Sequence, residues 1–386
     1  MDTKLAARKH LELSKEKLVK LSHNIHANPE IAYEEEKTSL WLSEFLDSQG
    51  FKVEQGIAGL PTAFKATFGS GPLNIGICAE LDALPGVGHA CGHNIIATSG
   101  VGAGIAASKV ADDLGITITV LGTPAEEYLK SGGKIVMLEN GAFDDLHAAL
   151  MNHPMSLDIE EMAILAASFF EVRYKGKSAH ASGAPEKGIN AADAMTIAQT
   201  AIGLNRPTMR STDRVHGIIT KGGDAHNIIP ELVTADYAVR AKTVDDLNIV
   251  YEKTMRAFEA GALATGAELT IDGGSKPFAH MEHDHEMASL YRVNMESLGR
   301  SFATPEQAWG IPVSTDMGNV SLAIPSIHPG ISIDTKGAAN HQPAFADACA
   351  TASADRAVYD GALGMAWTAI DIASNKNLRE RLLKKV

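Results

Sequence analysis

The chain has 386 residues, and its 47 acidic against 34 basic side chains give a formal net charge of −13. So acidic a protein is unsuited to non-specific binding of nucleic acid or of an anionic membrane. A chain of this length is too long to fold around a single ordinary hydrophobic core, and it is suited to two domains. The three cysteines are too few for a disulfide framework, and no apolar run reaches the roughly 18 residues of a membrane span. We therefore expect a cytoplasmic protein with neither nucleic-acid nor membrane partners.

The first part of the chain alternates helices with strands. Apolar residues at helical spacing predict helices over 3–25, 34–49 and 95–107. Apolar runs between glycines and prolines predict strands over 51–55, 63–68, 73–79, 115–121 and 148–151. This alternation indicates an α/β layer around a largely buried sheet. Gly100, Gly102 and Gly104 lack the position of a dinucleotide-binding fingerprint and indicate close packing of the third helix.

From residue 168 onward the pattern changes to β-α-β-β-α-β. Strands are expected over 169–175, 216–221, 232–241 and 268–273, with helices over 190–205 and 245–261. This order predicts a compact sheet with helices on one face, and we assign residues 168–280 to an inserted second domain. Residues 1–167 and 281–386 are then the two parts of the first domain. Its second part is expected to contain helices over 286–298 and 345–372 and an interrupted strand over 324–333.

Residues 82–94 contain half of a possible metal site. Cys91 and His93 stand two residues apart at the end of the strand 73–79, among glycines that let the backbone bend around an ion. Cys91 also precedes a predicted helix, whose dipole favours the thiolate form of a nearby cysteine. A structural thiol beside a polar histidine is the alternative for this pair alone. The remaining ligands of a metal site must therefore lie downstream.

Other polar residues also follow predicted strands. Glu126 and Glu127 come after the strand 115–121, and His153 follows the strand 148–151. Active groups in open α/β sheets gather outside the carboxyl ends of strands, so we expect these side chains near Cys91. Adjacent residues of an extended segment point in opposite directions, so one glutamate can bind metal while the other holds a water. Taken alone, Glu126 and Glu127 would more commonly form a solvated acidic turn, and His153 would more commonly be a structural histidine of a turn.

Several weaker signals carry no predicted function. The histidines at 280, 283 and 285 lie among acids and are interpreted as a solvated domain junction. The sequence Gly176-Lys-Ser is not a phosphate-binding loop, because Glu171 occupies the position of the required glycine. Cys78 and Cys349 are interpreted as small buried hydrophobic residues.

Together the motifs resemble the M20 metallopeptidase and amidohydrolase family. They are Asp82-Ala-Leu-Pro, the stretch 89–94 with its Cys-Gly-His, Glu126-Glu127, His153-Pro and His341. The Cys-Gly-His form is similar to the aminoacylase-like branch, which includes auxin-conjugate and aminobenzoyl-glutamate hydrolases. The resemblance extends over nearly the whole chain, including 26–30, 176–180, 188–193, 223–230 and Arg240. It implies an α/β fold: a mixed-sheet di-metal catalytic domain with an inserted ferredoxin-like (βαββαβ) lid/dimerisation domain.

The resemblance also implies roles for individual residues. Two divalent metal ions per subunit, Zn²⁺ or Mn²⁺, would be held by Cys91, His93, Glu127, His153 and His341, with Cys91 bridging. Glu126 would be the general base, and Asp82 would orient a ligand from outside the coordination sphere. The lid would form a homodimer or a dimer of dimers, in which His180 stabilises the oxyanion in the neighbouring subunit's site. The carboxylate of a small amide or peptide substrate would be held by Asn227 and Arg240.

The sequence departs from the family pattern in three places. Glu80 stands where many relatives carry Asp or a metal-binding His, and Asn94 stands where many carry Asp. An acidic run often found after the last histidine is missing here, so His328 is an alternative to His341 as a ligand.

The expected function is metal-dependent hydrolysis of the amide bond of N-acyl amino acids or short peptides with a free carboxylate. One alternative is a non-catalytic homologue that binds metal or peptide, although the intact Glu126 argues against a closed site without a base. Another is an endopeptidase acting on longer peptides. A third makes Cys91 a nucleophile with His93 as its base, but near neighbours on a turn seldom align for that chemistry.

Overall fold

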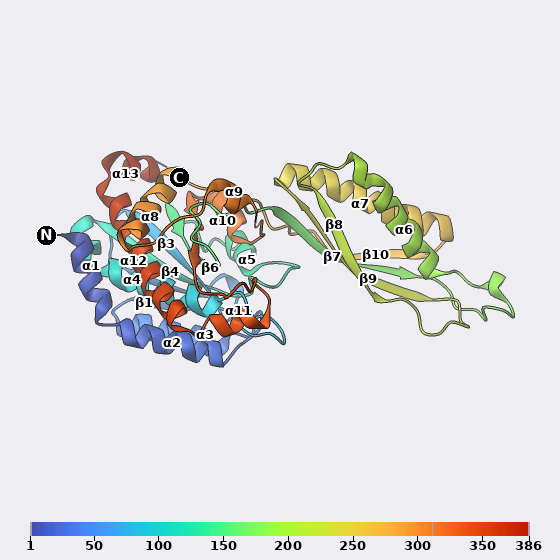
Figure 1. Ribbon diagram of the computed structural model, residues 1–386, viewed down its shortest axis with the longest axis horizontal. Coiled ribbons are helices and arrows are strands. Elements are labelled where there is room, and N and C mark those ends of the chain that lie inside the picture. The colour runs from blue at the N-terminus through green and yellow to red at the C-terminus, as the bar shows by residue number, and fades with distance from the viewer. Residues whose placement is uncertain (1, 311, 385–386) are drawn as a thin grey trace. The chain divides into compact units, whose positions relative to one another are not determined.

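The computed structural model describes residues 2–310 and 312–384, and the chain divides into two compact units (Figure 1). The first unit comprises Met1–Tyr128, Gly132–Ala163 and Met281–Val386, and the second comprises Leu129–Ser131 and Ile164–His280. The main part of the second unit, Ile164–His280, overlaps the segment 168–280 that the sequence assigned to an inserted domain. This unit also includes the short segment Leu129–Ser131, which follows closely after Glu126 and Glu127 in the chain.

A six-stranded mixed sheet forms the centre of the first unit. Its order is β1-β2-β4-β3-β5-β11, in which β3, β4, β5 and β11 are parallel and the two strands at one edge are antiparallel. The strands are β1 (Lys52–Gln55), β2 (Phe64–Phe68), β3 (Leu73–Glu80), β4 (Ile116–Thr123), β5 (Ala148–Leu150) and β11 (Ser326–Ile327). A separate parallel pair joins β6 (His153–Met155) to β12 (Gly330–Ser332). The strands β3 and β4 are buried throughout, as expected for parallel strands covered on both faces.

Helices surround this sheet. They are α1 (Thr3–Glu12), α2 (Lys15–Ala27), α3 (Glu36–Ser48), α4 (His93–Leu114), α5 (Gly133–Glu139), α8 (His285–Ser297), α9 (Pro305–Trp309), α10 (Met317–Ala323), α11 (Pro343–Ala348), α12 (Ala352–Ser374) and α13 (Lys376–Leu383). Within residues 2–310 and 312–384, each helix is too short or too polar to cross a membrane.

Two predicted helices are each broken into two in the structure. The helix predicted over 3–25 separates into α1 and α2 at Ser14, and this break lets Leu11 and Leu18 both pack beside Gly102 of α4. The helix predicted over 345–372 separates into α11 and α12, because the Thr351 side chain accepts a hydrogen bond from the N–H of Ala354 and caps a new helix.

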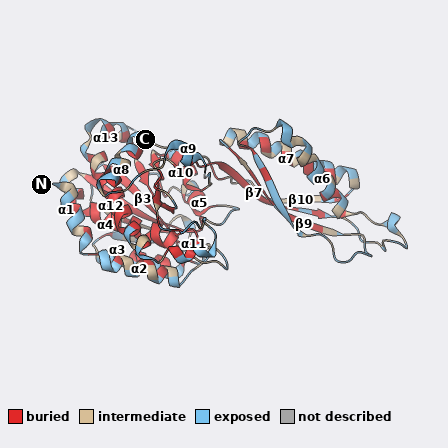
Figure 2. Cartoon of the chain, viewed as in Figure 1, coloured by how far each residue is buried: buried red, intermediate tan, exposed pale blue. Residues whose placement is uncertain are grey.

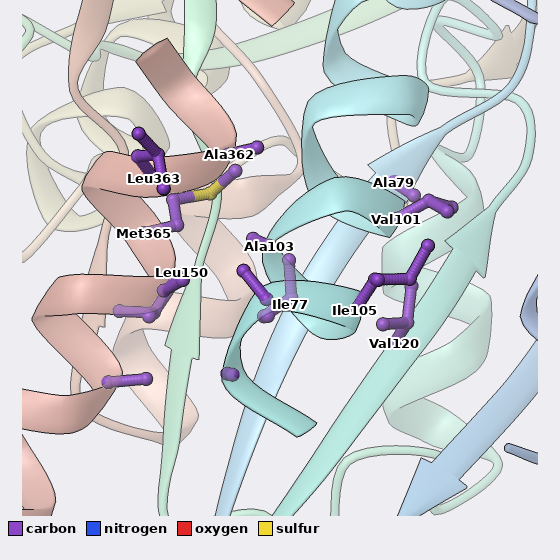
Figure 3. Packing of buried hydrophobic residues seen from close by; sticks show 14 of the residues in the cluster. Ile77, Ala79, Val101, Ala103, Ile105, Val120, Leu150, Ala362, Leu363 and Met365 are labelled. Carbon is purple, nitrogen blue, oxygen red and sulfur yellow. The ribbon is translucent and has the colours of Figure 1, made fainter. Parts of the chain in front are cut away.

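The helix α4 is the most deeply buried helix of the first unit and packs between the sheet and α12 (Figures 2 and 3). A Cβ atom on Gly104 would lie 2.4 Å from the Val120 side chain, and one on Gly102 would lie 2.9 Å from Ala362 Cβ. The close packing predicted for these glycines is confirmed. Since α4 begins at His93, its packing on both sides also fixes the start of the helix where the predicted ligands lie.

The second unit has the β-α-β-β-α-β order expected from the sequence. Its antiparallel sheet has the order β10-β7-β9-β8, and its helices gather on one face around their own hydrophobic core (Figure 1). The elements are β7 (Ala166–Lys175), α6 (Ala191–Asn205), β8 (Arg214–Lys221), β9 (Leu232–Ala241), α7 (Val244–Thr265) and β10 (Glu268–Gly273). This topology confirms the predicted ferredoxin-like insertion.

Candidate metal centre

The candidate metal centre begins where two parallel strands end side by side. In the register of β3 and β4, Glu80 pairs with Thr123, so the segments that carry Asp82 and Glu126 leave the sheet at the same edge. The strand β6 adds His153 through its own first residue. The expectation that these polar groups meet at the carboxyl ends of strands is confirmed, because their side chains form groups of close ligand atoms.

Gly92 sets the geometry of the Cys91-Gly92-His93 turn. Its φ of +79° lies in the left-handed region, which glycine enters without the strain that a Cβ causes. A Cβ here would also lie 2.3 Å from Pro154 Cγ. Both observations exclude a larger residue, so the cysteine and the histidine can stand on either side of a sharp turn at the start of α4.

Five predicted ligands form two triads that share Cys91. One triad is Cys91, His93 and His153, and the other is Cys91, Glu127 and His341, with the ligand atoms of each triad within 4.8 Å of one another. Cys91 Sγ lies 3.4 Å from His153 Nε2, and His341 Nε2 lies 3.2 Å from Glu127 Oε1. The shared thiol is the position from which one side chain could bridge two ions, as the resemblance implied for Cys91.

The polar atoms of these triads fit a pair of divalent cations. Among the described residues, His93 Nε2 and Glu127 Oε1 are buried without a hydrogen bond of good geometry, although buried polar atoms are normally paired. Burial lowers the pKa of His93, but the carboxylates of Glu80 and Asp82 outweigh it and raise the pKa well above its usual range. Such excess negative charge also favours a metal cation. Imidazole, thiolate and carboxylate together are a donor set for zinc or a similar transition metal.

One expectation about Cys91 is wrong. The helix dipole was expected to favour its thiolate, but burial and the charge of Glu127 raise the pKa of the thiol well above its usual range. A partial charge at the end of α4 is weaker than the desolvation of a buried anion. The helix dipole alone therefore does not favour the thiolate here, and a nearby cation would be needed to stabilise it.

The structure distinguishes between the two histidines considered for the last ligand. His341 belongs to the second triad, and its backbone N–H donates to Ala90 O at 2.8 Å, which ties it to the Cys91 turn. His328 is buried with its ring 5.7 Å from that of His153, and it belongs to neither triad. The geometry therefore favours His341 over His328.

Asp82 contacts both the ligands and the segment of the two glutamates. Its Oδ1 lies 3.3 Å from His93 Nδ1, on the ring nitrogen opposite the one that faces Glu80. Its two oxygens also accept hydrogen bonds from the backbone N–H groups of Glu126, at 3.1 Å, and Glu127, at 2.9 Å. Asp82 thus holds the ring of one candidate ligand and the backbone of another, a geometry suited to the orienting role that the resemblance implied.

Glu126 lies outside both triads that contain Cys91, and with Glu80 and His93 it forms a third group whose possible ligand atoms lie within 4.8 Å of one another. Its Oε2 is 3.9 Å from His93 Nε2, and its side chain is about one-tenth exposed. Burial, followed by the charges of Glu80 and Glu127, raises the pKa of Glu126 well above its usual range. A carboxyl group in this setting is suited to accept a proton from a reacting water.

A buried lysine between two carboxylates adjoins the centre and was not predicted. Lys134 Nζ lies 2.5 Å from Glu80 Oε1 and 2.6 Å from Asp316 Oδ1, and all three side chains are fully buried. Glu80 Oε2 then faces His93 Nε2 at 3.2 Å. The position of Glu80 at a strand end was a usable signal, but no pattern around Lys134 or Asp316 indicated their burial.

Replacing Lys134 with methionine is expected to destabilise the first unit by about 3–5 kcal/mol, since it leaves two buried carboxylates without their counter-charge. All three tryptophans (41, 309 and 367) belong to the first unit, so their fluorescence during urea unfolding of the metal-free protein measures this change. Lys52→Met is the control, because its pair with Glu54 belongs to the same unit, is exposed and is expected to contribute less than about 1 kcal/mol. Equal unfolding midpoints for the two variants would contradict a central role of this ion pair.

The remaining predicted site residues belong to the second unit. His180 Nδ1 accepts from the N–H groups of Ser182 and Gly183, at 3.3 and 3.0 Å, and Asn227 O accepts from the N–H of Ala181 at 3.0 Å. His180 and Asn227 are thus neighbours. Arg240 lies on β9 with its guanidinium 5.4 Å from the centre of the Phe169 ring, and it lines a cavity of about 630 Å³. The roles of these three residues stay predictions.

Comparison with known proteins identifies the family to which the chain belongs. A profile of Peptidase family M20/M25/M40 matches residues 77–357. The chain is 35% identical to the Xaa-Arg dipeptidase of Mus musculus over 99% of this chain and 91% of that protein. It is 31% identical to one of the subunits of p-aminobenzoyl-glutamate hydrolase from Escherichia coli (strain K12), over 68% of this chain and 58% of that protein.

A solved structure has the same fold. It is the YXEP protein of Bacillus subtilis, described as a dinuclear metal binding peptidase from the M20 family, with a TM-score of 0.70 and 21% identity. The match covers 94% of this chain and 99% of that one, and it confirms the predicted fold class. Because the family profile also extends over most of the chain and the mouse relative over nearly all of it, the protein is a member of peptidase family M20/M25/M40 and, with it, a hydrolase.

Proposed function

We propose that the protein is a metal-dependent hydrolase that cleaves the amide bond of dipeptides or N-acyl amino acids with a free carboxylate. The observation that carries this proposal is the pair of triads joined at Cys91, with Glu126 beside them and outside both. The similarity to Xaa-Arg dipeptidases over nearly the whole chain favours dipeptides that end in a basic residue as the first substrates to test.

The proposed roles follow from the positions of the side chains. Cys91, His93, Glu127, His153 and His341 would hold two divalent ions, Zn²⁺ or Mn²⁺. Such ions supply a water of lowered pKa and polarise the scissile carbonyl. Glu126 takes the proton from the attacking water and delivers it to the leaving amine. Asp82 keeps the His93 ring and the backbone of the two glutamates in place.

A substrate panel tests the proposal directly. Dipeptides ending in arginine or lysine, N-acyl amino acids and aminobenzoyl-glutamate are each incubated with enzyme loaded with Zn²⁺, Mn²⁺ or Co²⁺, before and after chelation. Hydrolysis that disappears on chelation and returns with metal is the expected result. Activity that survives complete metal removal excludes the mechanism, and inactivity on every compound favours a metal- or peptide-binding protein. Cleavage within longer peptides alone would favour an endopeptidase.

Arg240 is proposed to bind the substrate carboxylate. Arg240→Ala is then expected to raise KM about 10- to 100-fold for substrates with a free carboxylate, because a hydrogen bond to a charged group contributes about 1.5–3 kcal/mol. The matched control is Arg173→Ala, an exposed arginine of the neighbouring strand β7 that pairs with Glu171. An unchanged KM in Arg240→Ala, or an equal rise with amidated substrates, would assign carboxylate binding to another residue.

The second unit is proposed to form a homodimer, alone or within a dimer of dimers, that brings His180 to the neighbouring subunit's site. One supporting feature is β8, an edge strand on which Ile218 is 67% exposed, since open edge strands can pair with another chain. A mixture of His180→Ala and Glu126→Gln proteins should then recover activity above the sum of its components, because mixed dimers restore one complete site. Sedimentation velocity measures the dimer, and a mixture without recovery would exclude the exchange of His180 between subunits.

A further inference from the structure

Glu35 is a buried carboxylate for which the proposed mechanism has no role. It lies before α3 with no exposed surface, and its carboxylate accepts three hydrogen bonds. Its Oε1 accepts from the N–H groups of Tyr33 at 2.9 Å and Ala125 at 2.8 Å, and its Oε2 accepts from the Thr62 hydroxyl at 2.8 Å. Burial and the charge of Asp82 raise the pKa of Glu35 to about 7. Three donors surround its two oxygens, so the carboxylate is well matched to this position.

The hydrogen bond between Glu35 and Ala125 is important because of the position of Ala125 in the chain. It directly precedes Glu126 and Glu127, and its φ of +56° lies in the left-handed region that residues with a Cβ rarely adopt. Such strain persists only where the surrounding structure holds it. The carbonyl of Ala125 also accepts from the N–H of Gly133 at 3.1 Å, so its backbone is held at both ends.

Two buried carboxylates bind different backbone amides of this turn. Glu35 binds the N–H of Ala125, and Asp82 binds the next two N–H groups along the chain, those of Glu126 and Glu127. Three consecutive amides of the turn are therefore fixed by side chains from two other segments. Glu35 belongs to none of the ligand groups among the described residues, and its hydrogen bond to the segment of the two glutamates is the one from the N–H of Ala125.

We propose that Glu35 is a positioning residue: by binding the N–H of Ala125 it holds the strained turn that aims Glu126 and Glu127 at the metal centre. This inference deepens the proposed function and rests on it where catalysis is concerned. Its structural part, the fixing of the turn, stands independently of any substrate.

Glu35→Gln tests the inference. Tyr33 and Ala125 share Oε1, so a glutamine oxygen in that position would still accept from both, but as an uncharged and therefore weaker acceptor. The Thr62 hydroxyl would lose its acceptor, because the amide nitrogen replaces Oε2. Glu30→Gln is the matched control, because Glu30 is also in the loop before α3 and accepts from the N–H groups of Lys37 and Thr38. Hydrogen exchange is measured for a peptide spanning residues 124–128 in the metal-loaded protein, and kcat, KM and metal content are measured in parallel.

In Glu35→Gln we expect exchange of the turn amides to become at least tenfold faster and kcat to fall at least tenfold, with KM within about threefold of the parent. Glu30→Gln should change neither. Adding Ala125→Gly to Glu35→Gln should restore part of kcat, since glycine adopts a positive φ without strain. If the role of Glu35 were purely structural, Glu35→Gln would lower the stability of the protein and Ala125→Gly would not restore kcat. If Glu35→Gln fails to fold, Thr62→Val, which removes one donor to Glu35, should still accelerate exchange at 124–128.

The outcomes separate the two proposals. Unchanged exchange at 124–128 in Glu35→Gln overturns the positioning role, whatever the activity. Faster exchange without a loss of kcat also overturns it, because the turn would then not matter for catalysis. A parent protein that hydrolyses no substrate refutes the proposed function alone, and the exchange measurement still decides whether Glu35 holds the turn.

Discussion

Replacing Glu126 with glutamine is expected to lower kcat by about three orders of magnitude while both metal ions stay bound. General acid–base catalysis by a positioned side chain contributes about 10²- to 10⁴-fold, and glutamine keeps the shape of the side chain but cannot accept the proton. KM should change little, because Glu126 has no predicted role in holding the substrate. Steady-state kinetics and metal analysis by mass spectrometry measure the two parts of this prediction.

The neighbouring residue provides the contrast for this experiment. Glu127→Gln makes the same chemical change one position along the chain, but Glu127 belongs to the triad with Cys91 and His341. It should therefore lose metal as well as activity. Metal loss in Glu126→Gln, or metal retention in Glu127→Gln, would show that the two roles are reversed. Turnover that survives in Glu126→Gln would remove the residue from the mechanism.

Cys91→Ala is expected to abolish activity and to reduce the bound metal below one ion per chain at micromolar free Zn²⁺. Cys91 is the one residue common to both of these triads among the described residues, so under the proposed coordination its loss would remove a ligand from each ion. Ligands that hold a metal jointly lose affinity steeply when one is deleted. Metal content after dialysis against buffered Zn²⁺, together with hydrolysis of the best substrate, provides the measurement.

Cys78→Ala is the control for the loss of a buried thiol. Cys78 lies fully buried in β3, outside both triads, and its replacement should lower stability slightly while the metal stays in place. Two ions retained by Cys91→Ala would refute the bridging role. Loss of metal in Cys78→Ala to the same extent would show that the effect comes from disturbed packing rather than from coordination.

The sequence was most informative about the fold where the hydrophobic pattern was long. The strands 73–79 and 115–121 and the order of elements in the second unit were predicted to within a few residues. The breaks within 3–25 and 345–372 were missed, because the apolar pattern continues through Ser14 and Thr351. A break there follows from packing on α4 and from a capping side chain, and the local pattern specifies neither.

The candidate ligands could be found from sequence because each stands next to a strand end or a glycine turn. The Lys134 pair could not be found, since its partner Asp316 is 182 residues away and nothing near either residue indicates burial. The same limit explains the wrong expectation for the Cys91 thiol. Helix position is visible in the sequence, whereas the desolvation that opposes it depends on tertiary packing.

The burial of α4 also determines when the metal site can form during folding. A helix with apolar or small residues on nearly every face has no stable state on its own in water, and this one needs both β3 and α12, from distant parts of the chain, to cover it. Cys91 and His93 stand at its first turn and therefore take up their positions only after these long-range contacts exist. We therefore expect the chain to fold before it binds metal, so that the metal-free protein can take up ions after synthesis.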